Sequence, residues 1–309
     1  MRNSNHSQRA TGFTLIELMV AMGITAIIIT VLVSITGIAT DTWTRSRDEI
    51  RASRQAKVML DTMARDLESL VVRRGNDFEW LHAKLETGGN LPPVSSGGGN
   101  SSEAIGLTFL TAATDRYLGQ VGEEFPENAG DVSCASYRLR YQDPIEGGAD
   151  DRTSTFVLYR LLVNPDEAFV DLLGQPDLDA AFDKYEGNID DQENFICENV
   201  HQFSMAFHVE VTRTADDGSN ELRTARIVLG SAAGNGDFRV TGRGIQTTLD
   251  AEGFTPQEIQ AGRLRAVEIS MSVLSDGGIA RMNARDGLDQ KDYARNAYHY
   301  TRMIELPGM

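Results

Sequence analysis

Residues 13–40 read FTLIELMVAMGITAIIITVLVSITGIAT, an apolar run in which Glu17 is the only ionisable side chain. About 20 helical residues cross the roughly 30 Å hydrocarbon core of a bilayer, so the run is long enough to span a membrane. A carboxylate within a span is costly in lipid and by default marks a functional contact with a partner. The run therefore predicts a transmembrane helix in which Glu17 is a functional residue.

The charged residues beside the run indicate its orientation. Arg2 and Arg9 precede it without any acid, whereas Arg45, Arg47 and Arg51 follow it. Basic residues before a first span favour a cytoplasmic N-terminus, and this leading flank usually outweighs basic residues on the far side. We expect a single-pass membrane protein with a cytoplasmic N-terminus and its C-terminal domain on the far side of the membrane.

Three simpler kinds of segment fit the run less well. A cleaved secretory signal has a shorter apolar region followed by a small-x-small cleavage site, and no convincing site follows this run. A lipoprotein signal needs a cysteine beside the apolar residues, where this sequence has none. A plain membrane anchor explains the length and the flanks, but it leaves Glu17 without a role.

Residues 12–18 read GFTLIEL, which resembles the class III leader of type IV pilins and of type II secretion pseudopilins. In that family a prepilin peptidase cuts after the glycine, the new N-terminal phenylalanine is methylated, and the glutamate at the fifth mature position helps subunits enter a filament. The resemblance implies that residues 1–12 are a leader peptide, that Gly12 and Phe13 flank the processing site, and that Glu17 acts in assembly. It covers some thirty residues, so it indicates a class of protein and not the task of the body.

The chemistry of this junction has a physical basis. A glycine before the cut leaves the backbone accessible to a protease at the membrane surface. Cleavage exposes an α-amine at the end of an apolar helix, and this cation needs an anion in a filament core. Glu17 of an adjacent subunit can supply one, and a buried charge pair can fix register even where it adds little net stability.

After the span, the sequence predicts that the helix continues. No Gly or Pro interrupts residues 38–74, and apolar residues recur there at steps of three and four while charged residues occupy the other face. These apolar residues are Met59, Leu60, Met63, Ala64, Leu67, Leu70 and Val71. The period is typical of an amphipathic helix. We expect one helix over residues 13–72, with residues 13–40 as the membrane or filament-core stem and residues 41–86 as its amphipathic helical continuation.

The rest of the chain predicts a linker and a β-rich domain. Residues 87–102 have the Gly, Ser and Pro composition of a flexible linker, and residues 103–309 form the predicted periplasmic globular domain. Strand-like alternation occurs at residues 104–110, 136–141, 154–163, 203–211, 224–229, 265–274 and 300–306. Residues 164–196 have room for a short helix, whereas residues 231–262 and 276–298 read mainly as loops. We expect an α+β, pilin-like fold whose long N-terminal α-helix packs on an antiparallel β-sheet.

The body of the chain is strongly acidic. The net charge is −16 with a pI near 4.7, and residues 75–309 hold 38 acidic and 19 basic side chains. Such a surface repels phosphate backbones, so we expect no nucleic acid partner. The partners that the resemblance implies are a prepilin peptidase, other pilin-like subunits and the inner membrane.

Cys134 and Cys197 are the two cysteines of the sequence. In a periplasmic body they would form one disulfide that closes a loop of roughly 60 residues, worth ~4 kcal/mol in the loop-entropy model. The alternative is two unrelated buried thiols. The sequence leaves both open, because it does not show whether the two residues meet.

No catalytic or cofactor-binding set is recognisable in the sequence. The histidines, which are His6, His82, His201, His208 and His299, show no ligand spacing, and there is no phosphate loop, nucleophile elbow or HExxH motif. We therefore expect a protein that is not an enzyme and that has no metal site and no cofactor. Two acidic loops, residues 216–221 and 286–292, offer oxygen ligands for calcium, which some pseudopilins bind. They lack EF-hand spacing and are better interpreted as solvated turns.

The resemblance also narrows the type of subunit. Removing residues 1–12 leaves 297 residues, whereas the major subunits of these filaments are usually much shorter. We therefore expect a minor pilin-like (pseudopilin) subunit of a type IV pilus or type II secretion-like filament, at or near its tip. Glu17 disfavours the K type, which lacks this glutamate, and residues 51–74 look similar to the J and W types and to the C component of the Verru_Chthon cassette. The alternative is a membrane-tethered extracytoplasmic binding domain that uses a pilin-type leader.

Overall fold

The computed structural model describes residues 14–86, 104–112, 131–145, 153–214, 219–230, 236–285 and 288–306. The chain divides into two compact units, Met1–Ile50 and Arg51–Met309, and helix α1 (Leu15–Glu68) contributes to both. The predicted leader, Phe13 and the predicted linker lie outside the described residues.

The part of α1 in the first unit has no buried face. From residue 14 to residue 47 every side chain is exposed, the apolar ones included. Within residues 15–40, four threonine hydroxyls donate to the carbonyl oxygen four residues earlier at 2.8–2.9 Å; these are Thr25, Thr30, Thr36 and Thr40. Since these hydroxyls are satisfied within the helix, they are compatible with hydrocarbon surroundings.

The part of α1 in the second unit carries a buried apolar stripe, which confirms the amphipathic pattern. Its buried apolar residues are Ala52, Ala56, Met59, Leu60, Met63, Ala64 and Leu67. The helix ends at Glu68 and not at residue 72. Leu70 instead forms an antiparallel bridge with Thr111, and the Val71 N–H donates to the Leu110 carbonyl oxygen at 2.9 Å.

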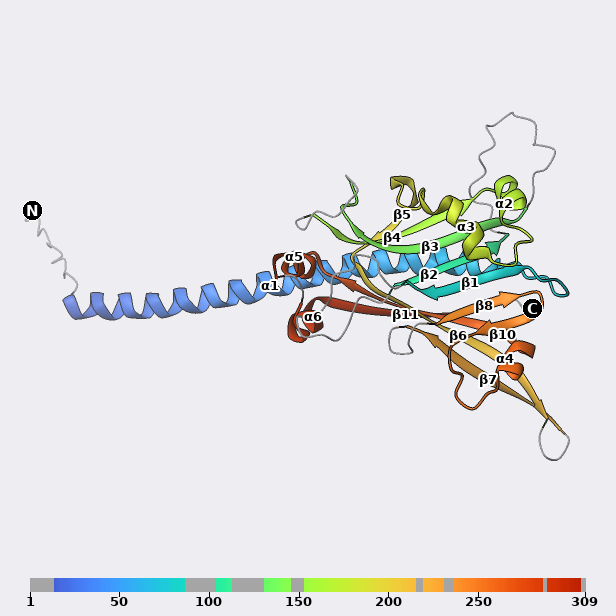
Figure 1. Ribbon diagram of the computed structural model, residues 1–309. Coiled ribbons are helices and arrows are strands. Elements are labelled where there is room, and N and C mark those ends of the chain that lie inside the picture. Colours follow the sequence, from blue (N-terminus) through green and yellow to red (C-terminus); the bar gives the residue numbers. More distant parts are fainter. Residues whose placement is uncertain are drawn as a thin grey trace, which may run out of the picture. The chain divides into compact units, whose positions relative to one another are not determined.

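Two antiparallel sheets make up the body (Figure 1). Sheet A has the order β5-β4-β3-β2-β1-β8-β9, and sheet B has the order β11-β10-β6-β7. The strands of sheet A are β1 (Glu79–Leu85), β2 (Ile105–Thr111), β3 (Ser133–Gln142), β4 (Thr155–Val163), β5 (Phe195–Glu198), β8 (Asp237–Thr241) and β9 (Gly244–Thr247). The strands of sheet B are β6 (Val200–Thr214), β7 (Asn220–Leu229), β10 (Arg263–Leu274) and β11 (Ala297–Glu305).

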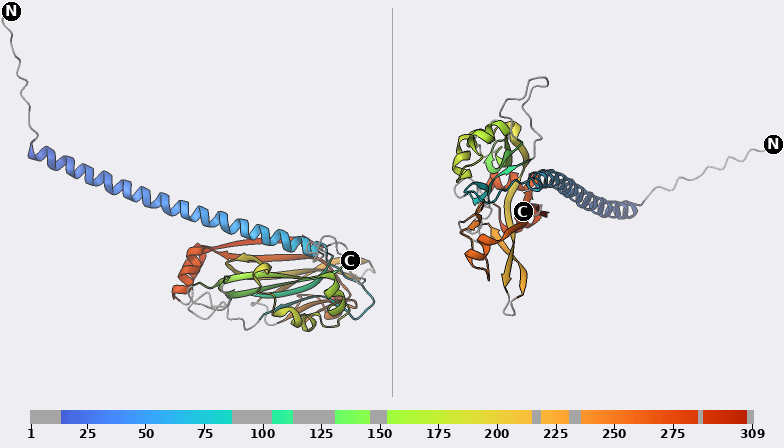
Figure 2. Two further views of the ribbon diagram at one scale, coloured as in Figure 1. Left: turned by 90° about the horizontal axis from the view of Figure 1, so that it is seen from above. Right: turned by 90° about the vertical axis from the view of Figure 1, so that its right-hand side faces the viewer.

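Short helices cover one face of sheet A and the ends of sheet B. They are α2 (Pro165–Asp171), α3 (Leu178–Glu186), the 3-10 helix η1 (Gln192–Asn194), α4 (Pro256–Ala261), α5 (Asp276–Arg285) and α6 (Gln290–Asn296). Helix α2 contacts β3, and α3 contacts β1 and β2. Figure 2 shows α5 and α6, in red, at one end of the long strands β10 and β11.

The central strands of sheet A, β1 to β4, are buried on both faces, as β4 illustrates. Phe156 and Leu158 lie in the core that contains α1 and sheet B, whereas Val157 and Tyr159 lie in a second core with α2 and α3. This alternation is the period of two expected of a strand. The predicted α+β fold, a long N-terminal helix packed on antiparallel sheet, is confirmed.

Four strands and several helices lie in ranges for which the sequence predicts other structure. The strand β1 lies within residues 41–86, so the prediction that the helix continues through this range is wrong beyond Glu68. Five of the seven residues of β1 are buried on both faces, so it lacks the polar alternation that identifies a half-exposed strand. The loop predictions are also wrong, because residues 231–262 hold β8, β9 and α4, and residues 276–298 hold α5 and α6. The short β5 is the fourth missed strand, whereas helices α2 and α3 do fall within residues 164–196.

The two cysteines are free, buried thiols. Cys134 lies on β3 and Cys197 on β5, with β4 between these strands. Cys134 packs in the core with α2 and α3, and Cys197 packs on the opposite face of sheet A in the core with α1. A disulfide requires Cβ atoms about 4 Å apart. The fold therefore contradicts the Cys134–Cys197 disulfide and favours the alternative of two separate thiols.

Candidate functional site

Glu17 takes part in a capping box at the start of α1. The Thr14 N–H and the Thr14 hydroxyl both donate to Glu17 Oε2 at 2.8 Å, and the Glu17 N–H donates back to Thr14 Oγ1 at 3.3 Å. These reciprocal bonds satisfy backbone donors that the first helical turn leaves open. The T-x-x-E spacing is visible in the sequence, but the sequence analysis assigns Glu17 to assembly alone. The structure therefore adds a local role for the carboxylate.

The helix around Glu17 presents a continuous apolar surface. Its large apolar side chains are half to three-quarters exposed, from 51% at Val31 to 76% at Leu15. Among the described residues, α1 is the one helix long and apolar enough to cross a membrane, and none of its most apolar stretch is buried. A helix that is apolar all round requires a membrane or other helices as its surroundings. This surface agrees with an anchor, and it leaves Glu17 as the charged group within it.

A buried ion pair joins the second half of α1 to sheet A. Asp66 of α1 is 1% exposed and accepts two hydrogen bonds from Arg160 of β4, at 2.7 and 2.8 Å. The hydroxyl of Tyr137 on β3 also donates to Asp66, at 2.5 Å. Burial and the adjacent Asp66 carboxylate raise the pKa of Tyr137 well above its usual range, so this hydroxyl remains a donor. The three side chains fix how α1 lies on the sheet.

A second polar cluster lies on the face of sheet A that α3 covers. Glu79 and His82 belong to β1, and Asp177 is the N-cap of α3. One carboxylate oxygen or ring nitrogen from each of the three lies within 4.8 Å of the others. Glu79 Oε1 and both ring nitrogens of His82 are buried without a hydrogen-bond partner. Burial raises the pKa of Glu79 to about 7 and lowers that of His82 to about 4, because it penalises the charged form of each.

The sequence does not reveal this cluster, because regular strand geometry would separate its members. Side chains three residues apart in a strand point to opposite faces. The pairing of β1 with β8 shifts register between Glu79 and Leu81. Such a bulge re-aims a side chain, which explains how Glu79 and His82 come to lie together. No spacing rule applied to the sequence would reveal the bulge or the approach of Asp177.

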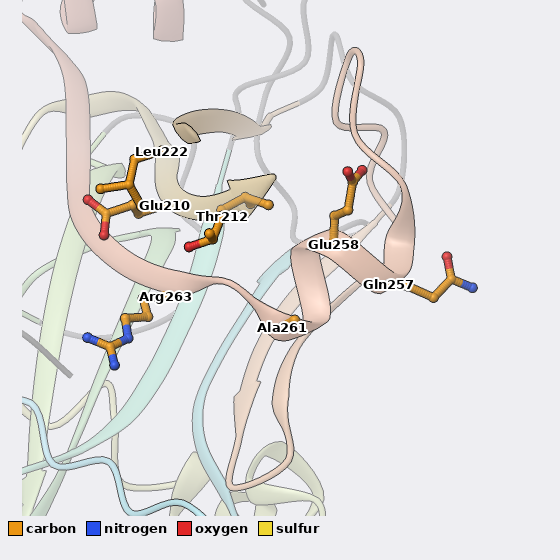
Figure 3. Close-up of a pocket in the computed structure, with 8 residues that line it drawn as sticks. Glu210, Thr212, Leu222, Gln257, Glu258, Ala261 and Arg263 are labelled. Carbon is orange, nitrogen blue, oxygen red and sulfur yellow. The ribbon is translucent and has the colours of Figure 1, made fainter. Parts of the chain in front are cut away.

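A hollow of about 500 Å³ lies beside α4 (Figure 3). Its lining residues are Glu210, Val211, Thr212, Leu222, Gln257, Glu258, Ala261 and Arg263. None of these eight is a His, Cys or Ser, and Gln257 extends away from Glu210 and Thr212. Glu258 is engaged locally: Arg213 Nε and the Thr255 N–H each donate to it at 2.8 Å, and these bonds lower its pKa to about 2. The Glu258 carboxylate in this hollow is therefore engaged in structural bonds.

The acidic loops considered for calcium are described only in part. Residues 216–218 and 286–287 lie outside the described residues. In the second loop, Asp289 accepts the Asp292 N–H at 2.6 Å as the N-cap of α6. The Asp292 carboxylate pairs with Arg281 at 3.5 Å and with Arg285 at 3.2 Å. These two carboxylates therefore have structural partners.

Residues 7–33 match the family model of the prokaryotic N-terminal methylation motif. The match includes Gly12, Phe13 and Glu17, the residues to which the sequence analysis assigns processing and assembly. No curated protein and no solved structure matches the chain. The motif and the long apolar helix are consistent with a type IV pilin-like protein, a class that is structural and not enzymatic. The motif implies processing by prepilin peptidase, N-methylation and assembly with other pilins.

Proposed function

We propose that this chain is a minor pseudopilin-type subunit that assembles, through α1, at or near the tip of a type IV pilus or type II secretion-like filament. The observation that carries the proposal is Glu17, the lone carboxylate within residues 15–40 of α1, a segment that is otherwise apolar, is exposed throughout and overlaps the methylation motif. The two-sheet body favours a minor subunit of the J or W type over a small major subunit. In the proposed topology, residues 1–12 face the cytoplasm and the body lies in the periplasm.

In the proposed mechanism, Glu17 forms a charge pair between subunits. Prepilin peptidase releases the leader and exposes the α-amine of Phe13. In the apolar core of a filament, this amine of one subunit pairs with Glu17 of a neighbour. The capping box holds the carboxylate at the N-terminus of α1, where the helix dipole also favours a negative charge. The carboxylate is therefore presented in a fixed position to an incoming subunit.

The capping box allows the charge to be tested apart from the cap. Glu17→Gln keeps a side chain that can complete a capping box but removes the charge. Thr14→Ala keeps the charge but removes the cap, which costs about 1 kcal/mol. Stranding one member of a buried charge pair costs roughly 3–5 kcal/mol, or at least 100-fold in association. Only the charge-pair mechanism predicts that Glu17→Gln is the more damaging variant.

The assay is co-purification of the full-length protein with other pilin-like subunits from cells with an active prepilin peptidase. Intact-mass analysis should first show, for wild type and both variants, loss of residues 1–12 and a methylated Phe13. We expect Glu17→Gln to lose co-purification and Thr14→Ala to retain most of it. Wild-type co-purification of Glu17→Gln would reject the charge pair, and a retained leader in the wild type would reject the pilin-like function itself. A C-terminal alkaline phosphatase fusion should be active if the body is periplasmic.

A further inference from the structure

The cluster of Glu79, His82 and Asp177 is arranged as a set of metal ligands. It combines one imidazole and two carboxylates, each with an atom within 4.8 Å of the others. Glu79 is 0% exposed and His82 is 4% exposed. Burying polar atoms without partners costs free energy, and such orphaned groups are rare in folded proteins. Among the described residues, no side chain bonds to these buried atoms. A bound ion could serve as their partner.

Both carboxylates are oriented by backbone donors near the start of α3. Glu79 Oε2 accepts the Leu178 N–H at 2.5 Å, which leaves Oε1 unpartnered. Asp177 Oδ1 accepts the Ala180 N–H at 3.0 Å, so its Oδ2 remains for another ligand. Outer hydrogen bonds of this kind are what orient ligands in protein metal sites. One oxygen of each carboxylate is held and the other is available.

The acidic side chains at the cluster outnumber the basic side chains that pair with them. Arg239 Nε donates to Asp237 at 2.7 Å, and Lys84 pairs with Asp179. Arg239 Nη1 also approaches Glu79 Oε1 and Asp177 Oδ2, but only to 3.6 and 3.8 Å, beyond hydrogen-bond distance. Arg239 is thus shared by Asp237, Glu79 and Asp177, and with these three acids ionised the group carries a net charge of −2, which one divalent cation matches.

We propose that Glu79, His82 and Asp177 bind one Zn²⁺ ion. Calcium and magnesium prefer oxygen ligands alone, whereas an imidazole with carboxylates suits zinc and its neighbours in the first transition series. Tetrahedral zinc with bonds of about 2.0–2.1 Å places its ligand atoms about 3.4 Å apart, so separations of up to 4.8 Å have to contract by at most about 1.4 Å on binding. Asp177 is half-exposed in side chain and lies ahead of α3, where this movement and a water ligand can be accommodated.

The bound ion would tie β1 of sheet A to the start of α3. This role is independent of the proposed assembly through α1, because all three ligands belong to the body. Zinc binding to the folded state alone would raise the melting temperature in proportion to the logarithm of the zinc concentration. The site is thus a structural clamp in the body.

The test is equilibrium dialysis of the full-length protein, in detergent and pretreated with EDTA, against Zn²⁺. We expect one zinc per chain and an increase in melting temperature with zinc, neither of which an equal concentration of Ca²⁺ produces. Glu79→Gln and His82→Gln should each weaken zinc binding at least about tenfold. His201→Gln is the matched control, because His201 is also buried with two unpartnered ring nitrogens but is not part of the cluster.

Two results would overturn the proposal. The first is a wild-type protein that takes up no stoichiometric zinc, in which case Arg239 is the counter-ion of the cluster. The second is zinc binding that both ligand variants retain at full affinity. Should the variants fail to fold, X-ray absorption of the wild-type zinc complex decides, because sulfur ligands or the absence of an imidazole would exclude this site.

Discussion

Replacing Asp66 by Ala removes the carboxylate that holds α1 against sheet A. Asp66 is 1% exposed, and it accepts bonds from Arg160 at 2.7 and 2.8 Å and from Tyr137 at 2.5 Å. Without Asp66, the buried Arg160 guanidinium loses the carboxylate that accepts two of its hydrogen bonds. Breaking a buried pair in this way costs about 3–5 kcal/mol of the free energy of unfolding. Since domains are stable by only about 5–15 kcal/mol, the loss is a large fraction of the total.

Two further variants separate the parts of this effect. Tyr137→Phe removes one hydrogen bond to a charged group, so we expect a smaller loss of about 1.5–3 kcal/mol. The double variant Asp66→Leu with Arg160→Met replaces the pair by apolar side chains. We expect it to be more stable than Asp66→Ala, because it leaves no stranded charge.

The assay is urea unfolding of the full-length protein in detergent, followed by tryptophan fluorescence, because Trp80 is 2% exposed in the folded state. The free energy of unfolding is obtained by linear extrapolation. A loss below about 1 kcal/mol in Asp66→Ala would refute the reasoning, as would a double variant less stable than Asp66→Ala.

Two other measurements probe the interior of the body. Burial, and to a lesser degree His299, lowers the pKa of His201 to about 3. In the unfolded state the pKa of His201 is near 6.5, so between pH 3 and pH 6.5 the unfolded state binds more protons than the folded state. The contribution of His201 to stability is therefore intact above pH 6.5 and falls as the pH drops, by about 2 kcal/mol between pH 7 and pH 5. His201→Phe, which keeps a ring between Phe156 and Tyr293, should lose this part of the pH dependence in urea unfolding, and an unchanged dependence would contradict the argument. Burial also raises the pKa of Cys134 and Cys197 to about 12. Both thiols should resist alkylation at pH 8 in the native protein and react in denaturant, whereas a Cys134–Cys197 peptide in a non-reducing map would contradict the fold.

Elements with a strong local pattern were predictable from the sequence. One face of α1 and one face of β6 pack against the core, and each leaves a periodic pattern of apolar residues in the sequence. The pattern is the buried stripe in α1 and the alternation of Phe203, Met205 and Phe207 in β6. Strand β1 was not predictable, because it lies in the part of sheet A that is buried on both sides, where a strand needs no polar face. The strands β8 and β9 are five and four residues long, too short for a periodic pattern to stand out.

The sequence by itself determined the class of the protein and its apolar helix. Membrane insertion depends mainly on the length of an apolar run and on the charges within and beside it. Here these are residues 13–40, Glu17 and the basic N-terminus, which are all close together in the sequence. Only the tertiary structure decided which distant side chains meet. Asp66 finds Arg160 94 residues away, Cys134 and Cys197 fall on opposite faces of sheet A, and a bulge in β1 brings Glu79 to His82. These contacts depend on strand register and on which face each side chain takes, and a shift of one residue reverses the face.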